Sequence, residues 1–511
     1  MNKKNPLLRA LPLLAGVLGN AYGIRVLIGG RHACTDGSVI RLPDLPAEAD
    51  ATFLGLVRGY IDHEAAHIRY TDFKCMQGLS DLERHIWNVF EDWRVENRLS
   101  ELFPGCQHNF AWLIRHIFLK DVPLEDGKPG RMLLDWLLLH VRSWDVAELG
   151  LNCTEMRDRL DGLWPGFLGR IEDLLEGMRE QCPDSWACLD YARKVVEIIR
   201  QTAGNGGSAS EDPERSVEAS RGGREEALRR LLQASQADLP TELGEILAES
   251  LETRAQGCPY AMRVATEGGR NMGPLSPEQL AEVGRATAGL RAKLHAALQG
   301  KRLRDIPARR GKVDLHRLHR VVACERRIFL RRGDGQGVSA AVHILLDCSG
   351  SMRKRIHFAS GVCHAVAKTL ALVGVNAAVT AFPAVTVDDG IACSVAPIVR
   401  HGQRVHSRFA LSASGRTPMC EALWWTLQQM VPLKESRRIV LIITDGTPDD
   451  VGAMHEAAKA ALGCGFELYG LGIDSPGIFT LLPASSVNIK EMHELAPAVF
   501  RLFGQALTRG I

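Results

Sequence analysis

The sequence predicts a multidomain protein with a mainly helical amino-terminal domain, a charged linker and a carboxyl-terminal α/β domain built on a parallel sheet. Apolar residues recur at three- and four-residue spacing through most of residues 1–202, which is the pattern of amphipathic helices. Beyond residue 338, short apolar runs alternate with helical patterns, as in a parallel sheet covered on both faces. A chain of 511 residues has room for roughly two to four such units.

The amino-terminal domain starts with a helical pattern and a small β-element. The helical pattern covers residues 7–19, and strand patterns follow at 24–28 and 38–42. Longer helical patterns come next, at residues 52–70, 79–102, 109–119, 131–146, 155–181 and 186–202. We therefore expect residues 1–202 to form one mainly helical domain with a small β-element near its start.

A change of composition marks the linker that follows. Residues 203–223 are rich in Gly, Ser and charged side chains, so they cannot bury enough apolar surface to offset the entropy cost of ordering. Charged helical patterns follow at 225–236, 241–255 and 277–298. We expect residues 203–300 to be a flexible linker and charged helical spacer, and residues 301–337 to be a segment that precedes the last domain.

The last domain, residues 338–511, has the alternation of a Rossmann-like fold. Strand patterns lie at residues 340–346, 377–382, 438–443, 467–473 and 486–489. Helical patterns lie between and after them, at residues 356–373, 419–430, 452–462 and 492–503. In open sheets of this kind, ligands bind beyond the carboxyl ends of the strands. We therefore expect the ligand-binding side chains of this domain at those ends.

Composition excludes several classes of partner. The 62 basic and 60 acidic residues give a net charge of +2, so there is no global attraction for nucleic acid or an anionic membrane. No apolar run approaches the ~20 residues of a membrane-spanning helix, and Arg9 interrupts the short apolar run at the start. The 13 cysteines are scattered without a CxxC pair, which is typical of reduced thiols. We expect a soluble cytoplasmic protein that binds neither nucleic acid nor membrane.

Oxygen-bearing side chains gather where the strands of the last domain end. The motif Asp-x-Ser-x-Ser directly follows the first strand, a threonine lies in the loop before residues 419–430, and an aspartate follows the strand at 438–443. These residues are Asp347, Ser349, Ser351, Thr417 and Asp445. Hard oxygen ligands select Mg²⁺, Mn²⁺ or Ca²⁺ over softer metals. Because Mg²⁺ takes six ligands, such a set leaves at least one position open.

This set resembles the metal-ion-dependent adhesion site (MIDAS) of von Willebrand factor A (VWA) domains. The resemblance implies a VWA fold for residues 338–511 and a divalent cation, Mg²⁺ or else Mn²⁺ or Ca²⁺, on the five residues. In that family the open coordination position takes an acidic side chain of a partner protein. The site is then a docking point, and it need not be catalytic.

A second candidate site lies in the amino-terminal domain, where residues 63–67 read His-Glu-Ala-Ala-His on a helical pattern. His63 and His67 share a helix face, so both imidazoles can reach one Zn²⁺, and Glu64 is the candidate catalytic residue that acts on metal-bound water. For the third ligand the next helix offers Glu91, with Glu96 as second choice. An HExxH helix followed by such a carboxylate resembles the gluzincin metallopeptidases. A metal-free hydrogen-bonded cluster that ties two helices together is the alternative.

Three stretches together resemble one family. They are FEDWRVENRL in the amino-terminal domain, GKVDLHRLHRVVACERRIFLRR before the last domain, and LLDCSGSMRKRIHFASGVCHAVAKTL within it. They are similar to the VWA-bearing subunit of aerobic cobaltochelatase, the CobT type. The resemblance implies a AAA+ ATPase partner of the MoxR or CobS type. The sequence has no GxxxxGK[ST] phosphate loop, so that ATPase must be another polypeptide. The short linker of mixed charge and the HExxH motif both depart from that family.

Three functions remain open from the sequence. The leading hypothesis is a MIDAS-containing VWA adaptor subunit for a MoxR/CobS-type AAA+ ATPase, which binds an acidic residue of a protein client through its divalent cation. The second is a zinc-dependent metallopeptidase whose VWA domain recruits substrate. The third is a cobaltochelatase subunit in cobalamin biosynthesis. The sequence leaves open whether the chain is an enzyme, and VWA partners of AAA+ proteins often form rings, so an oligomer is one of the expected states.

Overall fold

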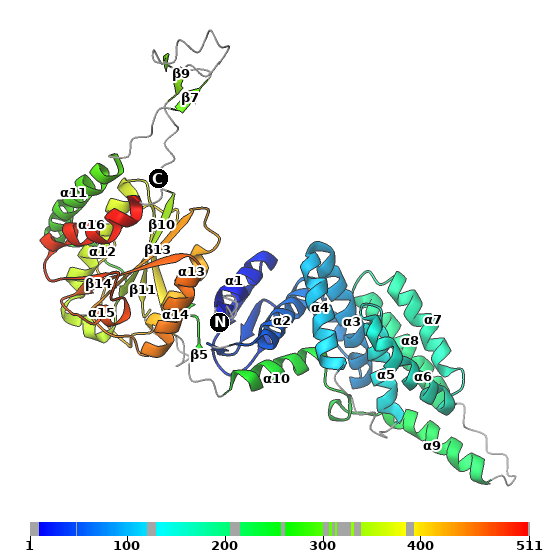
Figure 1. The fold of residues 1–511 in the computed structure, drawn as a ribbon. Helices are drawn as coiled ribbons and strands as arrows, with labels where there is room; N and C mark the ends of the chain where they lie inside the picture. Colours follow the sequence, from blue (N-terminus) through cyan, green and yellow to red (C-terminus); the bar gives the residue numbers. More distant parts are fainter. Residues whose placement is uncertain are drawn as a thin grey trace. The chain divides into compact units, whose positions relative to one another are not determined.

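The described part of the chain forms two compact units. The computed structural model describes residues 10–47, 49–119, 129–204, 215–256, 261–299, 306–308, 312–313, 329–331, 339–384 and 393–508 (Figure 1). The described residues of Leu18–Pro43 and Ala49–Gly257 make the unit that we call the helical unit. Those of Met1–Val17, Asp44–Glu48 and Cys258–Ile511 make the sheet unit. Residues 203–223, which we expected to be the linker, lie partly outside the described residues.

The helical unit carries the small β-element near its start. Strands β1 (Arg25–Ile28), β2 (Cys34–Thr35) and β3 (Val39–Leu42) form a sheet in the order β1-β3-β2. β1 and β3 run parallel, and β2 pairs antiparallel with β3. Ile40 and Leu42 of β3 are fully buried, which ties this small sheet to the hydrophobic core.

Two long helices form the centre of the helical unit. Helix α2 (Ala51–Tyr70) begins where the Asp50 side chain accepts a hydrogen bond from the Phe53 amide, which satisfies one of the free N–H groups of the first turn. Helix α3 (Asp81–Leu102) begins with a capping box between Ser80 and Glu83. The two helices pack against each other. This packing places the buried faces of α2 and α3 side by side, and these faces carry the polar residues of the amino-terminal candidate site.

Further helices surround this pair. They are α4 (Pro104–Phe118), α5 (Pro129–Ser143), α6 (Gly150–Leu163), α7 (Phe167–Glu180), α8 (Ser185–Gly204), α9 (Arg215–Leu232) and α10 (Leu243–Ala255). The single helical pattern predicted for residues 155–181 is two helices. Pro165 and Gly166 lie between them, and Gly166 has φ of +72°, a conformation that glycine adopts without strain. Helix α10 packs on α2.

The sheet unit contains the predicted, mostly parallel sheet. Its strand order is β15-β14-β13-β10-β11-β12-β6. The five predicted strands are β10 (Ala340–Asp347), β11 (Asn376–Phe382), β13 (Arg437–Thr444), β14 (Phe466–Ile473) and β15 (Ser486–Ile489). Strand β12 (Ser394–Val399) and the edge strand β6 (Thr266–Glu267) beside it were not predicted. All eight residues of β10 are buried, as a central parallel strand requires.

Helices cover both faces of this sheet. Helices α12 (Ile356–Leu372) and α16 (Leu495–Thr508) lie on one face, and α13 (Met419–Met430) and α14 (Val451–Gly463) lie on the other (Figure 1). Helix α11 (Pro277–Gln299) packs against α12 and α16, so part of the predicted spacer belongs to this unit. Among the described residues, no helix is long and apolar enough to cross a membrane.

Segments from the beginning of the chain complete the sheet unit. Strand β4 (Leu45–Pro46) pairs antiparallel with β5 (Ala261–Met262). The first residues of helix α1 (Leu11–Tyr22) contact α13, because the side chain of Gln428 donates a hydrogen bond to the Pro12 carbonyl over 2.6 Å. Three short strands, β7 (Ile306–Ala308), β8 (Lys312–Val313) and β9 (Phe329–Arg331), form a separate antiparallel sheet.

Candidate metal centres

Two neighbouring strands bring the predicted carboxylates of the sheet unit to one edge. β10 pairs in parallel with β13, with Leu346 opposite Ile443. Asp347 is the last residue of β10, and Asp445 directly follows β13. Both carboxylate residues therefore lie at the carboxyl end of the sheet, where open α/β sheets bind their ligands.

A chain of hydrogen bonds links four of the five residues predicted to form the cation site. Oδ1 of Asp347 accepts from the amide of Ser349 over 2.8 Å, and the hydroxyls of Ser349 and Ser351 are 3.0 Å apart. Ser351 then donates to Oδ1 of Asp445 over 2.8 Å. The other oxygen of Asp347 accepts from the Thr444 hydroxyl over 2.5 Å. Oxygen atoms of the Asp347 and Asp445 loops thus converge on one another.

The loop that carries Thr417 is tied to both of these loops through its backbone. Gly350 donates its amide to the Gly415 carbonyl over 3.0 Å, which joins the Thr417 loop to the Asp347 loop. The Asp449 amide donates to the Thr417 carbonyl over 3.1 Å, and the Asp449 carboxylate accepts from the Thr417 amide. The structure therefore brings all three sequence segments of the predicted site to the same edge of the sheet.

Burial and a neighbouring arginine set the electrostatic surroundings of the two carboxylates at this site. Asp347 is fully buried, and burial raises its pKa, as does the nearby charge of Asp445; hydrogen bonds from Thr444 and Ser349 act in the opposite direction. Arg355, which the sequence analysis did not identify, donates to Oδ2 of Asp445 over 2.9 Å. No sequence motif marks Arg355, because its partner Asp445 lies 90 positions away in the chain.

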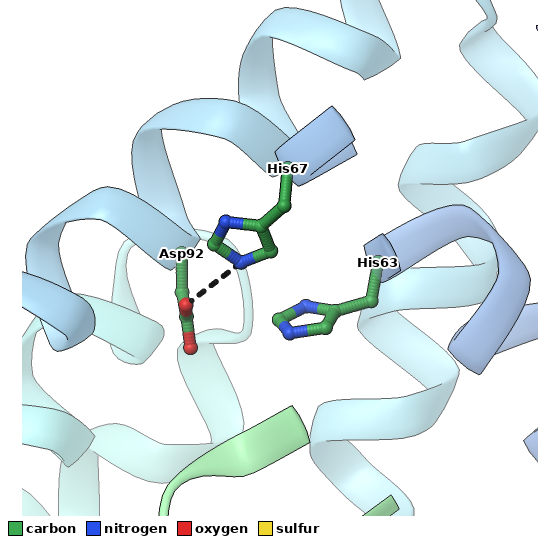
Figure 2. Close-up of side chains that lie close together, drawn as sticks. All are labelled: His63, His67 and Asp92. Carbon is green, nitrogen blue, oxygen red and sulfur yellow. Dashed lines mark hydrogen bonds and ion pairs between the residues drawn. The ribbon is translucent and has the colours of Figure 1, made fainter. Parts of the chain in front are cut away.

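The second candidate site lies in the helical unit, where two histidines of α2 face an aspartate of α3. His63 and His67 are one helical turn apart, and their rings meet edge to face with centroids 4.7 Å apart. Figure 2 shows both rings turned toward the Asp92 carboxylate. One ligand atom from each of His63, His67 and Asp92 lies within 4.8 Å of the other two. This separation fits residues that share one metal ion.

Neighbouring side chains hold each histidine at its other nitrogen. Nδ1 of His63 is 2.9 Å from Oε1 of Glu96, and Nδ1 of His67 is 3.0 Å from the Thr71 hydroxyl. The fully buried Arg142 of α5 donates to Glu96 over 2.5 Å and to Oδ2 of Asp92 over 3.2 Å. This guanidinium group thereby fixes α3 to α5, and α2 is linked to it only indirectly, through the contact of His63 with Glu96.

Glu91, the residue predicted as third ligand, does not join the histidines. Its oxygens accept hydrogen bonds from Arg94, Thr71 and Ser185. Successive helix residues point about 100° apart, so α3 turns Asp92 toward the two histidines and Glu91 toward Thr71 at the end of α2. Glu96, the second choice, reaches His63 but contacts its outer nitrogen. The four-residue spacing of Asp92 and Glu96 was the signal in the sequence for this shared helix face.

The second site is rich in charged groups and is covered by helix α10. Burial lowers the pKa of His63, but the hydrogen bond to Glu96 and the charges of Asp92, Glu96 and Glu64 outweigh it and raise that pKa to about 9. Helix α10 covers the site from one side. A Cβ atom at Gly244 would lie 3.4 Å from Nε2 of His63 and 3.6 Å from Oε1 of Glu64. The site is therefore anionic, buried and approached closely by the backbone of α10.

Models of known protein families match two parts of the chain. The model of the family described as cobalamin biosynthesis protein CobT matches residues 1–122. The model of the VWA domain of cobalamin biosynthesis protein CobT matches residues 328–401. The chain is a CobT-like VWA-domain protein. The first match of this CobT-like protein includes His63, His67 and Asp92, and the second includes the Asp347 loop, whereas Thr417 and Asp445 lie beyond it.

The solved structures that match the CobT-like protein share little sequence identity with it. A manganese-loaded TRAP protein from Plasmodium vivax is 15% identical, over 31% of this chain and 71% of that chain, with a TM-score of 0.25. A proximal thread matrix protein from the mussel byssus, solved with a zinc-occupied MIDAS motif, is 13% identical with a TM-score of 0.28. The match to it covers 33% of this chain and 46% of the mussel protein, less than half of its length. Among curated proteins, no match to the CobT-like protein was found.

Proposed function

We propose that this CobT-like protein is the client-binding VWA subunit of a chelatase-like assembly, and that it binds its client through a divalent cation at the MIDAS. The observation that carries the proposal is the hydrogen-bonded path from Asp347 through Ser349 and Ser351 to Asp445. Four oxygen-bearing side chains from two strand ends meet there, and the Thr417 loop is bonded to both. Mg²⁺ fits this donor set best, because carboxylate and hydroxyl oxygens are its preferred ligands; Mn²⁺ and Ca²⁺ are the alternatives.

The residues of the site have separate tasks in this proposal. Asp347 is held by Thr444 and by the Ser349 amide, so its carboxylate is oriented before any ion arrives. Ser351 is exposed and adjoins Asp445, which places the open side of the site toward solvent. A bound cation supplies one free coordination position on that side. An acidic side chain of a protein client matches the charge and ligand type of this position.

The assembly needs a second polypeptide to supply energy. The sequence contains no phosphate-loop motif, so we assign ATP hydrolysis to a separate AAA+ ATPase of the MoxR or CobS type. The family description favours cobalamin biosynthesis as the pathway. The resemblance to the cobaltochelatase subunit implies insertion of cobalt into a tetrapyrrole as the reaction that the assembly serves. In this role the VWA subunit positions the client and does not break a bond itself.

Because an acidic residue of the ATPase can fill the free coordination position as one of the client can, the test is binding to a purified AAA+ partner of this type, encoded in the same genome, with Mg²⁺ or with EDTA. We expect Mg²⁺-dependent binding by the full-length protein, and at least tenfold weaker binding by Asp347→Ala. Glu456→Ala is the matched control, because Glu456 lies on α14 and pairs with Lys459 outside the site. Binding that is unchanged by both EDTA and Asp347→Ala would refute docking through the cation. ATP-dependent cobalt insertion by the reconstituted pair then tests the reaction.

A further inference from the structure

The contacts of His67 fix the position of its proton. The Thr71 hydroxyl has a single hydrogen, which it donates to Oε1 of Glu91 over 2.9 Å. Its oxygen must therefore accept from Nδ1–H of His67 in their 3.0 Å contact. In a neutral His67 the lone pair is consequently on Nε2, which lies 3.1 Å from Oδ1 of Asp92. Two acceptor atoms at this distance repel each other unless a cation lies at or between them.

The same reasoning applies to His63. Its Nδ1 faces the Glu96 carboxylate over 2.9 Å, and an ionised carboxylate only accepts hydrogen bonds. Nδ1 therefore carries the proton, and Nε2 of a neutral His63 has the lone pair. Arg142 donates to the second oxygen of Glu96, so both oxygens of this carboxylate face a donor. A carboxylate or hydroxyl on the outer nitrogen is the usual arrangement for histidines that bind a metal through the inner one.

Three electron-pair donors thus converge at a buried point. They are Nε2 of His63, Nε2 of His67 and Oδ1 of Asp92, on residues whose ligand atoms lie within 4.8 Å of one another. One extra proton on His67 would satisfy its contact with Asp92 and leave Nε2 of His63 without a role. One metal ion would satisfy all three donors together. We propose that His63, His67 and Asp92 bind a transition-metal ion, and that this ion is Zn²⁺.

The ligand types select zinc over the ion of the MIDAS. Two imidazole nitrogens and one carboxylate oxygen suit Zn²⁺, whereas Mg²⁺ prefers oxygen ligands alone. Zinc ligands at roughly 2.0–2.2 Å from the ion in tetrahedral geometry are about 3.3 Å apart. Nε2 of His67 and Oδ1 of Asp92, at 3.1 Å, are already near this separation, and the cluster as a whole, within 4.8 Å, would close around the ion. Glu64 and Gly244 lie next to Nε2 of His63, and we place the fourth coordination position on their side of the ion.

Metal content of the full-length protein tests this assignment. Because a MIDAS can also hold zinc, as the mussel protein does, the measurement uses an Asp347→Ala background. We expect about one zinc per chain by elemental mass spectrometry after purification without chelator, and tetrahedral absorption bands after replacement by Co²⁺. The His67→Asn and Asp92→Asn variants should lose both signals. His85→Gln, which changes a buried histidine of α3 outside the cluster, should keep them.

A second variant separates metal binding from folding. Thr71→Val leaves all three ligands in place and removes only the acceptor for Nδ1 of His67, so zinc affinity should fall by roughly tenfold and Thr71→Ser should restore it. Circular dichroism checks that each variant is folded. The proposal is overturned if folded Asp347→Ala protein takes up neither zinc nor Co²⁺, or if zinc persists in both His67→Asn and Asp92→Asn. Neither result bears on the client binding proposed for the MIDAS.

Discussion

Arg355 donates to Oδ2 of Asp445 over 2.9 Å while Oδ1 of the same carboxylate accepts from Ser351 over 2.8 Å. The guanidinium group therefore neutralises a carboxylate of the proposed cation site from the side opposite Ser351. A second contact, 3.4 Å to Oδ2 of Asp474, holds the Arg355 side chain in this position. Its positive charge must influence how strongly a divalent cation binds nearby.

Replacement of Arg355 by glutamine should strengthen cation binding at the MIDAS. The guanidinium repels a nearby divalent ion, and removing a repulsion of about 1 kcal/mol raises affinity roughly fivefold. Mn²⁺ titration followed by electron paramagnetic resonance measures the change, and the gain should shrink at high salt. Arg353→Gln is the control, because Arg353 is exposed on the same turn. Equal or weaker Mn²⁺ binding by Arg355→Gln would show that this arginine supports the site instead of opposing the ion.

Loss of Arg142 should destabilise the helical unit. The side chain is fully buried and bonded to Asp92 and Glu96, so Arg142→Met leaves two buried carboxylates without their shared partner. We expect a loss of about 3–5 kcal/mol in the free energy of unfolding, measured by urea titration in EDTA. Arg157→Met removes a partly exposed pair with Glu172 and should cost less than about 1 kcal/mol. Similar losses in both variants would argue against a special role of the buried network.

The stability of the sheet unit should fall as the pH drops below about 6.5. Burial lowers the pKa of His343 on β10 well below its usual value, and burial lowers that of His401 to about 4. Between pH 6.5 and 4 the unfolded chain therefore binds protons that the folded chain rejects, so the free energy of unfolding decreases; above pH 7 these groups contribute nothing. For His401 alone the loss at pH 5 is about 1–2 kcal/mol.

Calorimetric melting at pH 7.5 and pH 5 measures this dependence. In wild type the transition of the sheet unit should move to lower temperature at pH 5, and His401→Gln should reduce that shift. His493→Gln changes a histidine whose side chain is 75% exposed, and it should melt as wild type does at both pH values. A shift as large in His401→Gln as in wild type would place the acid sensitivity elsewhere.

Glu64→Gln distinguishes a zinc ligand from a residue that acts on the fourth coordination position. Glu64 is not part of the three-residue cluster, so its change to glutamine should leave zinc content and Co²⁺ absorption unchanged. If the site hydrolyses peptides, as the HExxH motif allows, the same variant should lose that activity by at least a hundredfold because the base is gone. Loss of zinc in Glu64→Gln would instead assign this carboxylate to the coordination sphere.

The sheet could be predicted from the sequence because its strands are short apolar runs bounded by polar loops. β15 at Ser486–Ile489 has the predicted bounds. β12 was missed for a physical reason. It contains Pro397, which cannot donate a ladder hydrogen bond and argues against a strand unless the strand lies near an edge, as β12 does. The Asp347 motif could also be recognised in the sequence, because three of the predicted oxygen-bearing ligands lie within five consecutive residues.

The second site was harder to predict because its geometry depends on distant packing. Glu91 and Asp92 are adjacent carboxylates, and only the rotation of α3 decides which one faces the two histidines. Arg94, three residues after Glu91, pairs with it and was an overlooked local sign that Glu91 is occupied. Arg142 and Gly244 come from α5 and α10, and nothing in the sequence near residues 63–67 indicates that these helices meet the site.

The chain passes between the two units four times, because residues up to Val17 and around β4 belong with the sheet unit while the segments between them belong with the helical unit. Pro12 therefore leaves the ribosome more than four hundred residues before Gln428, the side chain that bonds to its carbonyl. A truncation that starts at residue 338 would lack both of these early segments and expose the part of α13 that the first residues of α1 contact. Supplying residues 1–48 as a separate peptide should therefore rescue expression of the isolated VWA region. Cleavage at the Gly- and Ser-rich segment would not separate the protein into its two units, because each unit contains residues from both sides of other crossings.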